Sequence, residues 1–503
     1  MQQRAKPMTS STKAETVGKM RSSDRAIKPS LLARFRKLLS GIPSSEKITL
    51  DSTPLVLSAN VRIARRSEPF NLMLGTAILE FHPDLPVTGS EKGSSMEWII
   101  HPGCVFYQSV PKFIRIRPGE AVILGRSDDL QTRVFGFDTS VADRHVKVFN
   151  RRGDLIFQPL EPELPTSISE IDQPIAVWKA RRENLLRLPD VLGCPLVQFE
   201  SEQALDIIRE VNAIVASEAY RSLNDDEDPG GIIQFPGDMT VVIMGDVHAR
   251  ADNVLRVITE GGTLAALENN EACLVFLGDV VHSQESDELE DMESSVFILD
   301  LFCMLKRRFP ENVFYIHGNH ESFSPDVGKG GVPQGMLFHR YLKKLRGKAY
   351  VSEIEKLFDG LAFVVQGDDF AACHGAPVRS RVNLNVLVNI RRYPGIQSEL
   401  VWNRLRQGNR PSGYSKGSVK RFRRTLNLPK HAPLIVGHTP QSNEDTLWLN
   451  VGGIEGHHIV YSAHTHRLAA IVMSEGQAIP LEFVPEPALT FLEDTVAGDL
   501  QEK

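Results

Sequence analysis

Apolar and polar residues alternate in short segments over the first third of the chain. Segments 113–117 and 145–149 show this alternation, and turn residues such as glycine and proline separate similar segments between about residues 48 and 165. Alternation over a few residues indicates strands with one buried face, so we expect an N-terminal all-β sandwich of antiparallel strands over 48–165. Residues 166–202 have a mixed pattern and are interpreted as a connector.

The pattern changes near residue 203. Apolar residues recur every three or four positions over 203–222, which predicts a helix. Beyond it, apolar runs rich in β-branched residues alternate with helical stretches such as 296–308 and 418–426. Strands that alternate with helices predict an α/β domain in which helices cover a sheet, here over 203–485. Residues 486–503 are interpreted as a C-terminal tail.

Composition limits the class of protein. A chain of 503 residues with 42% hydrophobic residues can form two or three domains, each with its own core. The net charge of -6 argues against nucleic acid as a partner, and no apolar run approaches the length of a membrane span. The amino terminus lacks the apolar core of a secretory signal peptide. Five cysteines without a CxxC pair favour buried thiols in a reducing compartment, so we expect a cytoplasmic protein.

The first residues form a basic segment. Residues 1–40 contain ten Lys or Arg but only two acidic residues, Glu15 and Asp24, and they show little hydrophobic patterning. Such a segment buries too little apolar surface to fold alone, so residues 1–47 are interpreted as a disordered, solvated tail. An address signal or a contact with a lipid surface is the alternative.

Five short motifs follow apolar runs in the second half of the chain. Each run is typical of a buried strand, and such strands present polar side chains where they end. Carboxylate oxygen, amide oxygen and imidazole are ligands for divalent metals, and one carboxylate can bridge two ions. The motifs are Gly245-Asp246-Val247-His248, Gly278-Asp279, Gly318-Asn319-His320-Glu321, His374-Gly375 and Gly437-His438-Thr439.

These motifs supply ligands for two metal ions. If residues 246–248 are extended, Asp246 and His248 point to the same side and reach one ion. Asp279 is the expected bridge between the ions. The full predicted ligand set is Asp246, His248, Asp279, Asn319, His374 and His438.

The order of the motifs resembles the phosphoprotein phosphatase family of calcineurin-like dinuclear metallophosphoesterases, over approximately 203–485. Trp402, the segment 410–417 and Tyr461-Ser462-Ala463 also resemble positions of that family. The resemblance implies an α/β fold with a metallophosphoesterase β-sandwich core flanked by helices. It also implies two divalent ions, with manganese expected and iron or zinc as alternatives.

The resemblance further implies a reaction. A hydroxide bound by the two metals attacks phosphorus in line, His320 protonates the leaving oxygen as general acid, and Arg410 and Asn319 contact the phosphate of a phosphoprotein or phosphopeptide. The chemistry agrees, because an alkoxide is a poor leaving group and the anionic transition state needs concentrated positive charge. A phosphodiesterase, a dinucleoside polyphosphate hydrolase and a non-enzymatic binding protein are the alternatives.

Several positions depart from the family's pattern around the phosphate. His282 stands where an Asp orients the acid histidine, and Ser283 stands where an arginine binds phosphate. The loss of a bidentate arginine removes a strong charge-assisted contact, so Arg410, Arg404 or a histidine is expected to replace it. His464-Thr465-His466 replaces the expected Pro-Asn-Tyr, and its histidines are alternative metal ligands.

Segment 111–165 resembles a forkhead-associated domain, a module that recognises phosphothreonine. Arg126 and His145 match that family, but Ala142 replaces its phosphate-contacting Ser, and Glu161-Pro162-Glu163-Leu164 replaces its Ser-Thr-Asn-Gly loop. We therefore expect a degenerate module that has a protein partner but does not read phosphothreonine in the usual way. An unrelated β-sandwich is the alternative.

Overall fold

The computed structural model describes residues 46–501, except 49, 51–52, 90–95, 104–105, 376 and 407–411. The predicted basic tail therefore lies outside the described residues up to residue 45.

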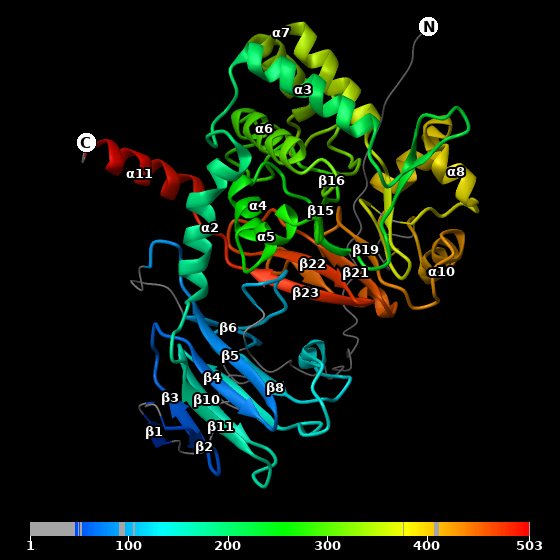
Figure 1. Cartoon of the computed structure of the whole chain (residues 1–503). Coiled ribbons are helices and arrows are strands. Elements are labelled where there is room, and N and C mark those ends of the chain that lie inside the picture. Colours follow the sequence, from blue (N-terminus) through cyan, green and yellow to red (C-terminus); the bar gives the residue numbers. More distant parts are fainter. Residues whose placement is uncertain are drawn as a thin grey trace, which may run out of the picture. The chain divides into compact units, whose positions relative to one another are not determined.

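Two facing sheets form the N-terminal part of the described chain (Figure 1). Their strand orders are β1-β3-β10-β9-β8 and β2-β11-β4-β5-β6-β7, and all neighbouring strands except β1 and β3 run antiparallel. The strands are β1 (Glu46–Ile48), β2 (Leu55–Val56), β3 (Val61–Ile63), β4 (Phe70–Leu74), β5 (Ala77–Asp84), β6 (Glu97–Pro102), β7 (Ile114–Ile116), β8 (Ala121–Leu124), β9 (Val146–Arg151), β10 (Asp154–Pro159) and β11 (Thr166–Glu170), with a 3-10 helix η1 (Gln131–Phe135) between β8 and β9.

Aromatic side chains fill the space between these sheets. Phe70 stacks on Phe81 with ring centroids 5.2 Å apart, and the edge of Trp98 meets Phe70 at 5.6 Å. Phe157 from the other sheet completes the cluster at 5.4 Å from Phe81. Alternating apolar residues on β4, β5 and β10 supply these rings, so the all-β sandwich expected from the sequence is confirmed.

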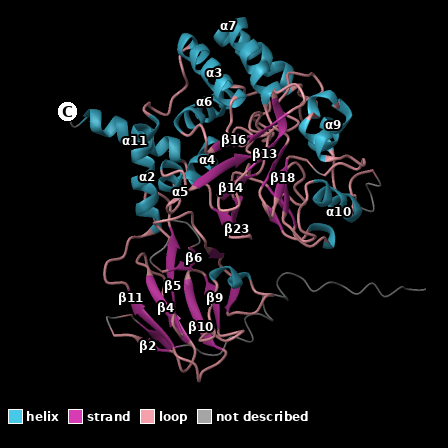
Figure 2. Cartoon of the chain, turned by 45° about the vertical axis from the view of Figure 1, so that its right-hand side comes forward, coloured by secondary structure: helices cyan, strands magenta, loops and turns pink. Residues whose placement is uncertain are grey.

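Two further sheets form the core of the second half, and helices lie around them (Figure 2). Their strand orders are β12-β13-β17-β18-β19-β21-β20 and β16-β15-β14-β22-β23, so the expected α/β class is confirmed. The strands are β12 (Arg221–Leu223), β13 (Pro229–Gln234), β14 (Thr240–Met244), β15 (Ala272–Phe276), β16 (Val313–Tyr315), β17 (Val364–Gln366), β18 (Ala371–Cys373), β19 (Leu434–Val436), β20 (Leu447–Trp448), β21 (His457–Val460), β22 (Leu468–Ser474) and β23 (Gln477–Phe483).

The helices cover these sheets. Helix α3 packs on α6 and on α7, which has a non-helical residue at Gly347. None of the described helices is long and apolar enough to cross a membrane. The helices are α2 (Val177–Leu192), α3 (Ser201–Ala216), α4 (Ala251–Ile258), α5 (Thr263–Glu268), α6 (Glu293–Arg308), α7 (Gln334–Gly360), α8 (Leu384–Val388), η2 (Ile390–Arg392), α9 (Pro394–Trp402), α10 (Lys416–Thr425), η3 (Val451–Gly453) and α11 (Ala488–Gln501).

The segment interpreted as a connector, 166–202, contains regular structure. Strand β11 pairs with β4 from Thr166 to Glu170, so the sandwich continues past residue 165. Helix α2 follows, and its buried residues include Leu185 and Leu188. The segment interpreted as a tail, 486–503, contains helix α11. The sequence pattern did not predict strand β11 or helices α2 and α11, because these elements are stabilised by tertiary packing and show no clear local periodicity.

A buried ion network ties the sandwich to the second half. Arg115 pairs with Asp84, and Arg181 contacts Asp84 at 3.1 Å and Glu486 at 2.6 Å. Arg256 contacts the same two carboxylates at 3.4 and 3.1 Å. Burial alone would raise the pKa of Asp84, but the three guanidinium charges hold it well below its usual value.

Candidate metal centre

Each predicted metal ligand lies just beyond the end of a strand. Asp246 follows β14, Asp279 follows β15 and Asn319 follows β16, and these strands are parallel neighbours in one sheet. His374 follows β18 and His438 follows β19, which are parallel neighbours in the other sheet. The carboxyl ends of both sheets therefore deliver ligands to one place.

The ligand atoms fall into two groups that share Asp279. One group contains His248, Asp279 and His320, the other contains Asp279, His374 and His438, and within each group the atoms lie within 4.8 Å of one another. The Asp279 carboxylate lies 3.4 Å from Nε2 of His374 and 3.9 Å from Nε2 of His248. A carboxylate shared in this way is placed to bridge two ions.

Asp246 and Asn319 complete this arrangement. Nε2 of His248 lies 3.7 Å from the Asp246 carboxylate, and Nε2 of His374 lies 3.0 Å from the Asn319 amide oxygen. The structure therefore brings together all six residues that the sequence predicted as ligands.

The backbone around the ligands is in an uncommon conformation. His248 has φ 45° and Ala249 has φ 64°, so residues 246–248 are not an extended segment and the reason given for placing Asp246 beside His248 is wrong. Asp279, His282 and His438 also have positive φ, at 49°, 69° and 62°. Such residues cost about 1–3 kcal/mol each and cluster at functional sites, where surrounding contacts hold them.

Backbone carbonyls orient two of the histidines. Nδ1 of His248 donates to the carbonyl of His282 at 3.0 Å, and Nδ1 of His374 donates to the carbonyl of Leu277 at 2.8 Å. Because Nδ1 of each ring bonds to a carbonyl, Nε2 is the atom left to bind a metal, and in His374 it would exchange its hydrogen bond with the Asn319 amide oxygen for the ion. Nε2 of His438 is buried and has no hydrogen-bond partner among the described residues. The donor set therefore fits divalent cations.

Backbone amides fix the two carboxylates. Asp246 accepts from the amide of His438 at 2.7 Å, and Asp279 accepts from the amide of His320 at 2.8 Å. Gly437 permits this approach, because a Cβ there would lie 2.2 Å from Oδ1 of Asp246. Burial would lower the pKa of His374, but the Asp279 carboxylate raises it to about 9. The same negative potential favours a cation.

Glu321 is a supporting residue to which the sequence analysis gave no role. Its carboxylate accepts from the amides of Gly318 at 2.7 Å, Asp279 at 2.9 Å and Val280 at 3.1 Å, and from the Tyr315 hydroxyl at 2.5 Å. It thus joins the loops after β15 and β16. Its place directly after His320 in the third motif was the only signal in the sequence.

His320 is hydrogen-bonded to His282, the residue that the sequence analysis placed where an Asp orients the acid histidine. Nδ1 of His320 lies 3.1 Å from Nδ1 of His282, and Nε2 of His320 lies 4.0 Å from the Asp279 carboxylate. Burial lowers the pKa of both imidazoles, and it lowers that of His282 well below the usual value. A neutral His282 can therefore accept a hydrogen bond from Nδ1 of His320 when His320 is protonated.

A cavity of about 640 Å³ opens over the ligands. Lys329 and Arg404 supply positive charge to its wall, and Trp402 also lines it. Lys329, in a glycine-rich segment, was missed because a single lysine among glycines carries no recognisable signal. Arg410, the predicted phosphate contact, lies outside the described residues.

His464 and His466 also line the cavity, with ring centroids 5.0 Å apart. Among the described residues, neither belongs to a cluster of metal-ligating side chains. Their alternative role as extra ligands therefore gains no support from the geometry.

Residues 239–468 match the calcineurin-like phosphoesterase family. The serine/threonine-protein phosphatase PP2A-like PPG1 of Candida albicans is 30% identical over 171 residues, which cover 32% of this chain and 36% of that protein. The human serine/threonine-protein phosphatase with EF-hands 1 is 25% identical over 161 residues, covering 32% of this chain and 22% of that protein. The chain thus spans less than half of either relative.

Among solved structures, a protein serine/threonine phosphatase from Saccharomyces cerevisiae with similarity to human phosphatase PP5 is 16% identical. The match covers 57% of this chain and 90% of that chain, with a TM-score of 0.43. The family match covers every residue of the predicted ligand set. Residues 239–468 are therefore similar to calcineurin-like phosphoesterases and have serine/threonine phosphatase homologues, and we call this segment the phosphoesterase domain.

Proposed function

We propose that this chain is a metal-dependent phosphatase that hydrolyses phosphate monoesters on phosphoproteins. The observation that carries the proposal is the pair of side-chain groups that share Asp279, one of which also contains His320. Asp246, His248, Asp279, Asn319, His374 and His438 would hold two divalent ions, with manganese the first candidate. When bound, these ions supply positive charge to the phosphate and activate water for attack on phosphorus.

His320 is positioned to act as the proton donor. Its Nδ1 atom is held by His282, and its Nε2 atom lies near Asp279 at the wall of the cavity. A protonated imidazole in this place can give its proton to the leaving alkoxide oxygen, which is otherwise a poor leaving group.

Lys329 and Arg404 take the place of the family's arginine clamp in this proposal. Both line the cavity, and their positive charges depress the pKa of His320 and His438 respectively, after the larger effect of burial. Two cations beside the ligands stabilise the charge that develops on phosphate oxygens in the transition state. Ser283, by contrast, donates its hydroxyl to Glu288 at 2.7 Å.

A substrate panel with added manganese tests the activity. It contains an aryl phosphate, phosphoserine and phosphothreonine peptides, a phosphotyrosine peptide, a bis-aryl phosphate diester and a dinucleoside polyphosphate. Faster turnover of the phosphopeptides supports the proposal. Preference for the diester would indicate a phosphodiesterase, and preference for the dinucleoside polyphosphate would indicate a dinucleoside polyphosphate hydrolase. If no substrate is turned over, the chain is a non-enzymatic binding protein.

We also propose that the sandwich is a forkhead-associated-like module that does not need phosphothreonine. Nε of Arg126 donates to the carbonyl of Val141 at 2.6 Å, and its guanidinium contacts Asp143 at 3.0 Å. Ala142 offers no side-chain donor, and its amide donates to Nδ1 of His145 at 3.2 Å. These contacts support a docking role for a protein partner or for the phosphoesterase domain itself.

The cysteines support a reducing compartment such as the cytoplasm. Cys194, Cys273 and Cys303 are free thiols, and burial raises the pKa of Cys273 to about 12. Such thiols are unreactive and fit a compartment without disulfide formation.

A further inference from the structure

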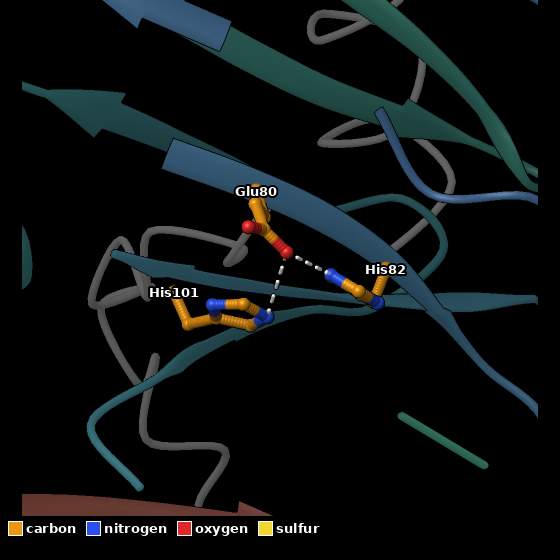
Figure 3. A group of neighbouring side chains, drawn as sticks. All are labelled: Glu80, His82 and His101. Atoms are coloured by element: carbon orange, nitrogen blue, oxygen red, sulfur yellow. Dashed lines mark hydrogen bonds and ion pairs between the residues drawn. The ribbon is translucent and has the colours of Figure 1, made fainter. Parts of the chain in front are cut away.

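A second cluster of metal-ligating side chains lies in the N-terminal sandwich, outside the phosphoesterase domain. Glu80 and His82 are two residues apart on β5, so both side chains point to the same face of the sheet. His101 on β6 is the direct cross-strand partner of Glu80. Figure 3 shows the three side chains turned toward one another. Both imidazoles are fully buried, with 0% of their surface exposed.

The hydrogen bond of His101 determines which of its nitrogens faces Glu80. Nδ1 of His101 lies 2.9 Å from the carbonyl oxygen of Pro102, so Nδ1 carries the proton and donates it to this carbonyl. Nε2 then holds a lone pair, and it faces the Glu80 carboxylate at 3.8 Å (Figure 3). Among the described residues Nε2 has no hydrogen-bond partner. A nitrogen lone pair and a carboxylate oxygen that face each other in a buried place are unfavourable unless a cation lies between them.

His82 lies on the other side of the same carboxylate. Its Nε2 atom is 2.8 Å from the Glu80 oxygen that His101 also faces, and its Nδ1 atom is buried without a partner among the described residues. Both imidazoles are fully buried, and burial favours their neutral form. Neutral imidazole is the form that binds metals.

We propose that Glu80, His82 and His101 bind one divalent transition metal ion, for which zinc is the best match. Two imidazole nitrogens and one carboxylate oxygen form a zinc ligand set that leaves a fourth position for water. Ligand atoms around a tetrahedral zinc ion lie about 3.3 Å apart. The two contacts of Glu80, at 2.8 and 3.8 Å, bracket this spacing, and all three ligand atoms lie within 4.8 Å of one another. His82 moves its proton from Nε2 to Nδ1 when Nε2 binds the ion.

The position of this site indicates a structural role. The ring of His101 stacks on Phe106 with centroids 4.2 Å apart, and the amide of Gly262 donates to the carbonyl of Phe106 at 3.2 Å. Gly262 lies in the turn between α4 and α5 of the phosphoesterase domain. An ion that fixes His101 therefore also fixes one of the loops through which the sandwich contacts that domain.

Zinc stoichiometry of the full chain tests the proposal. The unmodified chain and three variants, His82→Gln, His101→Gln and His145→Gln, are stripped with a chelator, reloaded with zinc, dialysed and analysed by mass spectrometry. We expect His82→Gln and His101→Gln each to lose one equivalent per chain. His145→Gln is the matched control, because His145 is also fully buried in the sandwich but lies outside the cluster, and it should keep the full amount. Equal zinc contents in all four chains would overturn the proposal.

A second measurement covers the case in which the variants do not fold. Anomalous diffraction at the zinc edge from crystals of the unmodified, zinc-loaded chain should show a peak between Glu80, His82 and His101. Density at the phosphoesterase ligands without a peak in the sandwich would refute the site. Because neither measurement uses phosphatase activity, failure here is distinguishable from failure of the proposed function.

Discussion

The Nδ1 atoms of His282 and His320 lie 3.1 Å apart in a buried part of the phosphoesterase domain. His282 stands at the position where the resembled family has an aspartate. A neutral imidazole can accept a hydrogen bond from protonated His320 but adds no negative charge to stabilise that imidazolium. On its Nδ1 side the proton donor is therefore supported by an uncharged partner, while the Asp279 carboxylate lies 4.0 Å from its Nε2 atom.

The first prediction is that His282→Asp shifts the pH profile of phosphate ester hydrolysis. Burial lowers the pKa of His320, so the protonated, active form is lost as pH rises through a low value. A carboxylate beside Nδ1 raises that pKa, and activity should persist to higher pH. Measurement of kcat/KM against pH in both proteins tests this, and identical profiles would show that His282 does not influence the acid.

The second prediction concerns the shared carboxylate. Asp279→Asn removes the charge that both ligand groups share, so metal content and turnover should fall together, turnover by about 100-fold or more. Asp287→Asn, an exposed position in the neighbouring loop, serves as control and should retain both. An Asp279→Asn chain with unchanged metal content and turnover would contradict the dinuclear site.

The third prediction assigns phosphate binding to Lys329 and Arg404. Loss of a charge-assisted contact costs about 1.5–3 kcal/mol, so Lys329→Ala and Arg404→Ala should each lower kcat/KM by about 10- to 150-fold. Inhibition by inorganic phosphate should weaken in the same variants. Lys343→Ala, at an exposed position of α7, should match the unmodified chain. If Lys343→Ala lowers kcat/KM as much as the two cavity variants do, the assignment of phosphate binding to Lys329 and Arg404 is wrong.

The fourth prediction concerns the buried ion network. Arg181→Ala leaves Asp84 and Glu486 without one guanidinium partner and should lower the free energy of unfolding by about 3–5 kcal/mol. Arg187→Ala, which breaks a half-exposed pair with Glu268, should cost about 1 kcal/mol or less. Denaturant unfolding measures both.

The pH dependence of stability checks the same network. The pKa of Asp84 is held below its usual value in the folded chain, so its contribution is complete above the ordinary carboxylate pKa of about 4. The contribution is lost as pH falls below that value. The stability difference between the unmodified chain and Arg181→Ala should therefore shrink in acid, and a difference that is constant with pH would argue against the network.

The fifth prediction is that the N-terminal sandwich does not bind phosphothreonine peptides through Arg126 with micromolar affinity. The half-exposed Arg126 is already paired with Asp143, and one charge-assisted contact is worth about 1–3 kcal/mol, which corresponds to millimolar or weaker binding. Titration with a degenerate phosphothreonine library, and with its unphosphorylated counterpart as control, measures this. Micromolar binding that is lost in Arg126→Ala would refute it.

The sequence alone predicted the N-terminal sandwich and the α/β class. It also identified the six candidate ligand side chains that the structure brings together at the phosphoesterase site. These features are local, because each ligand directly follows an apolar strand and the end of a buried strand has a definite place in a sheet. The contact of His282 with His320 was also inferred, because His282 occupies the position where the resembled family has the Asp that orients the acid histidine.

Only the tertiary structure decided the remaining features. The left-handed turn at His248, the position of Lys329 and the joining of loops by Glu321 depend on contacts between segments far apart in the chain. The cluster of Glu80 with His101 exists because the register of β5 and β6 places these residues opposite each other. Register follows from the packing of both sheets, and no local pattern of residues encodes it.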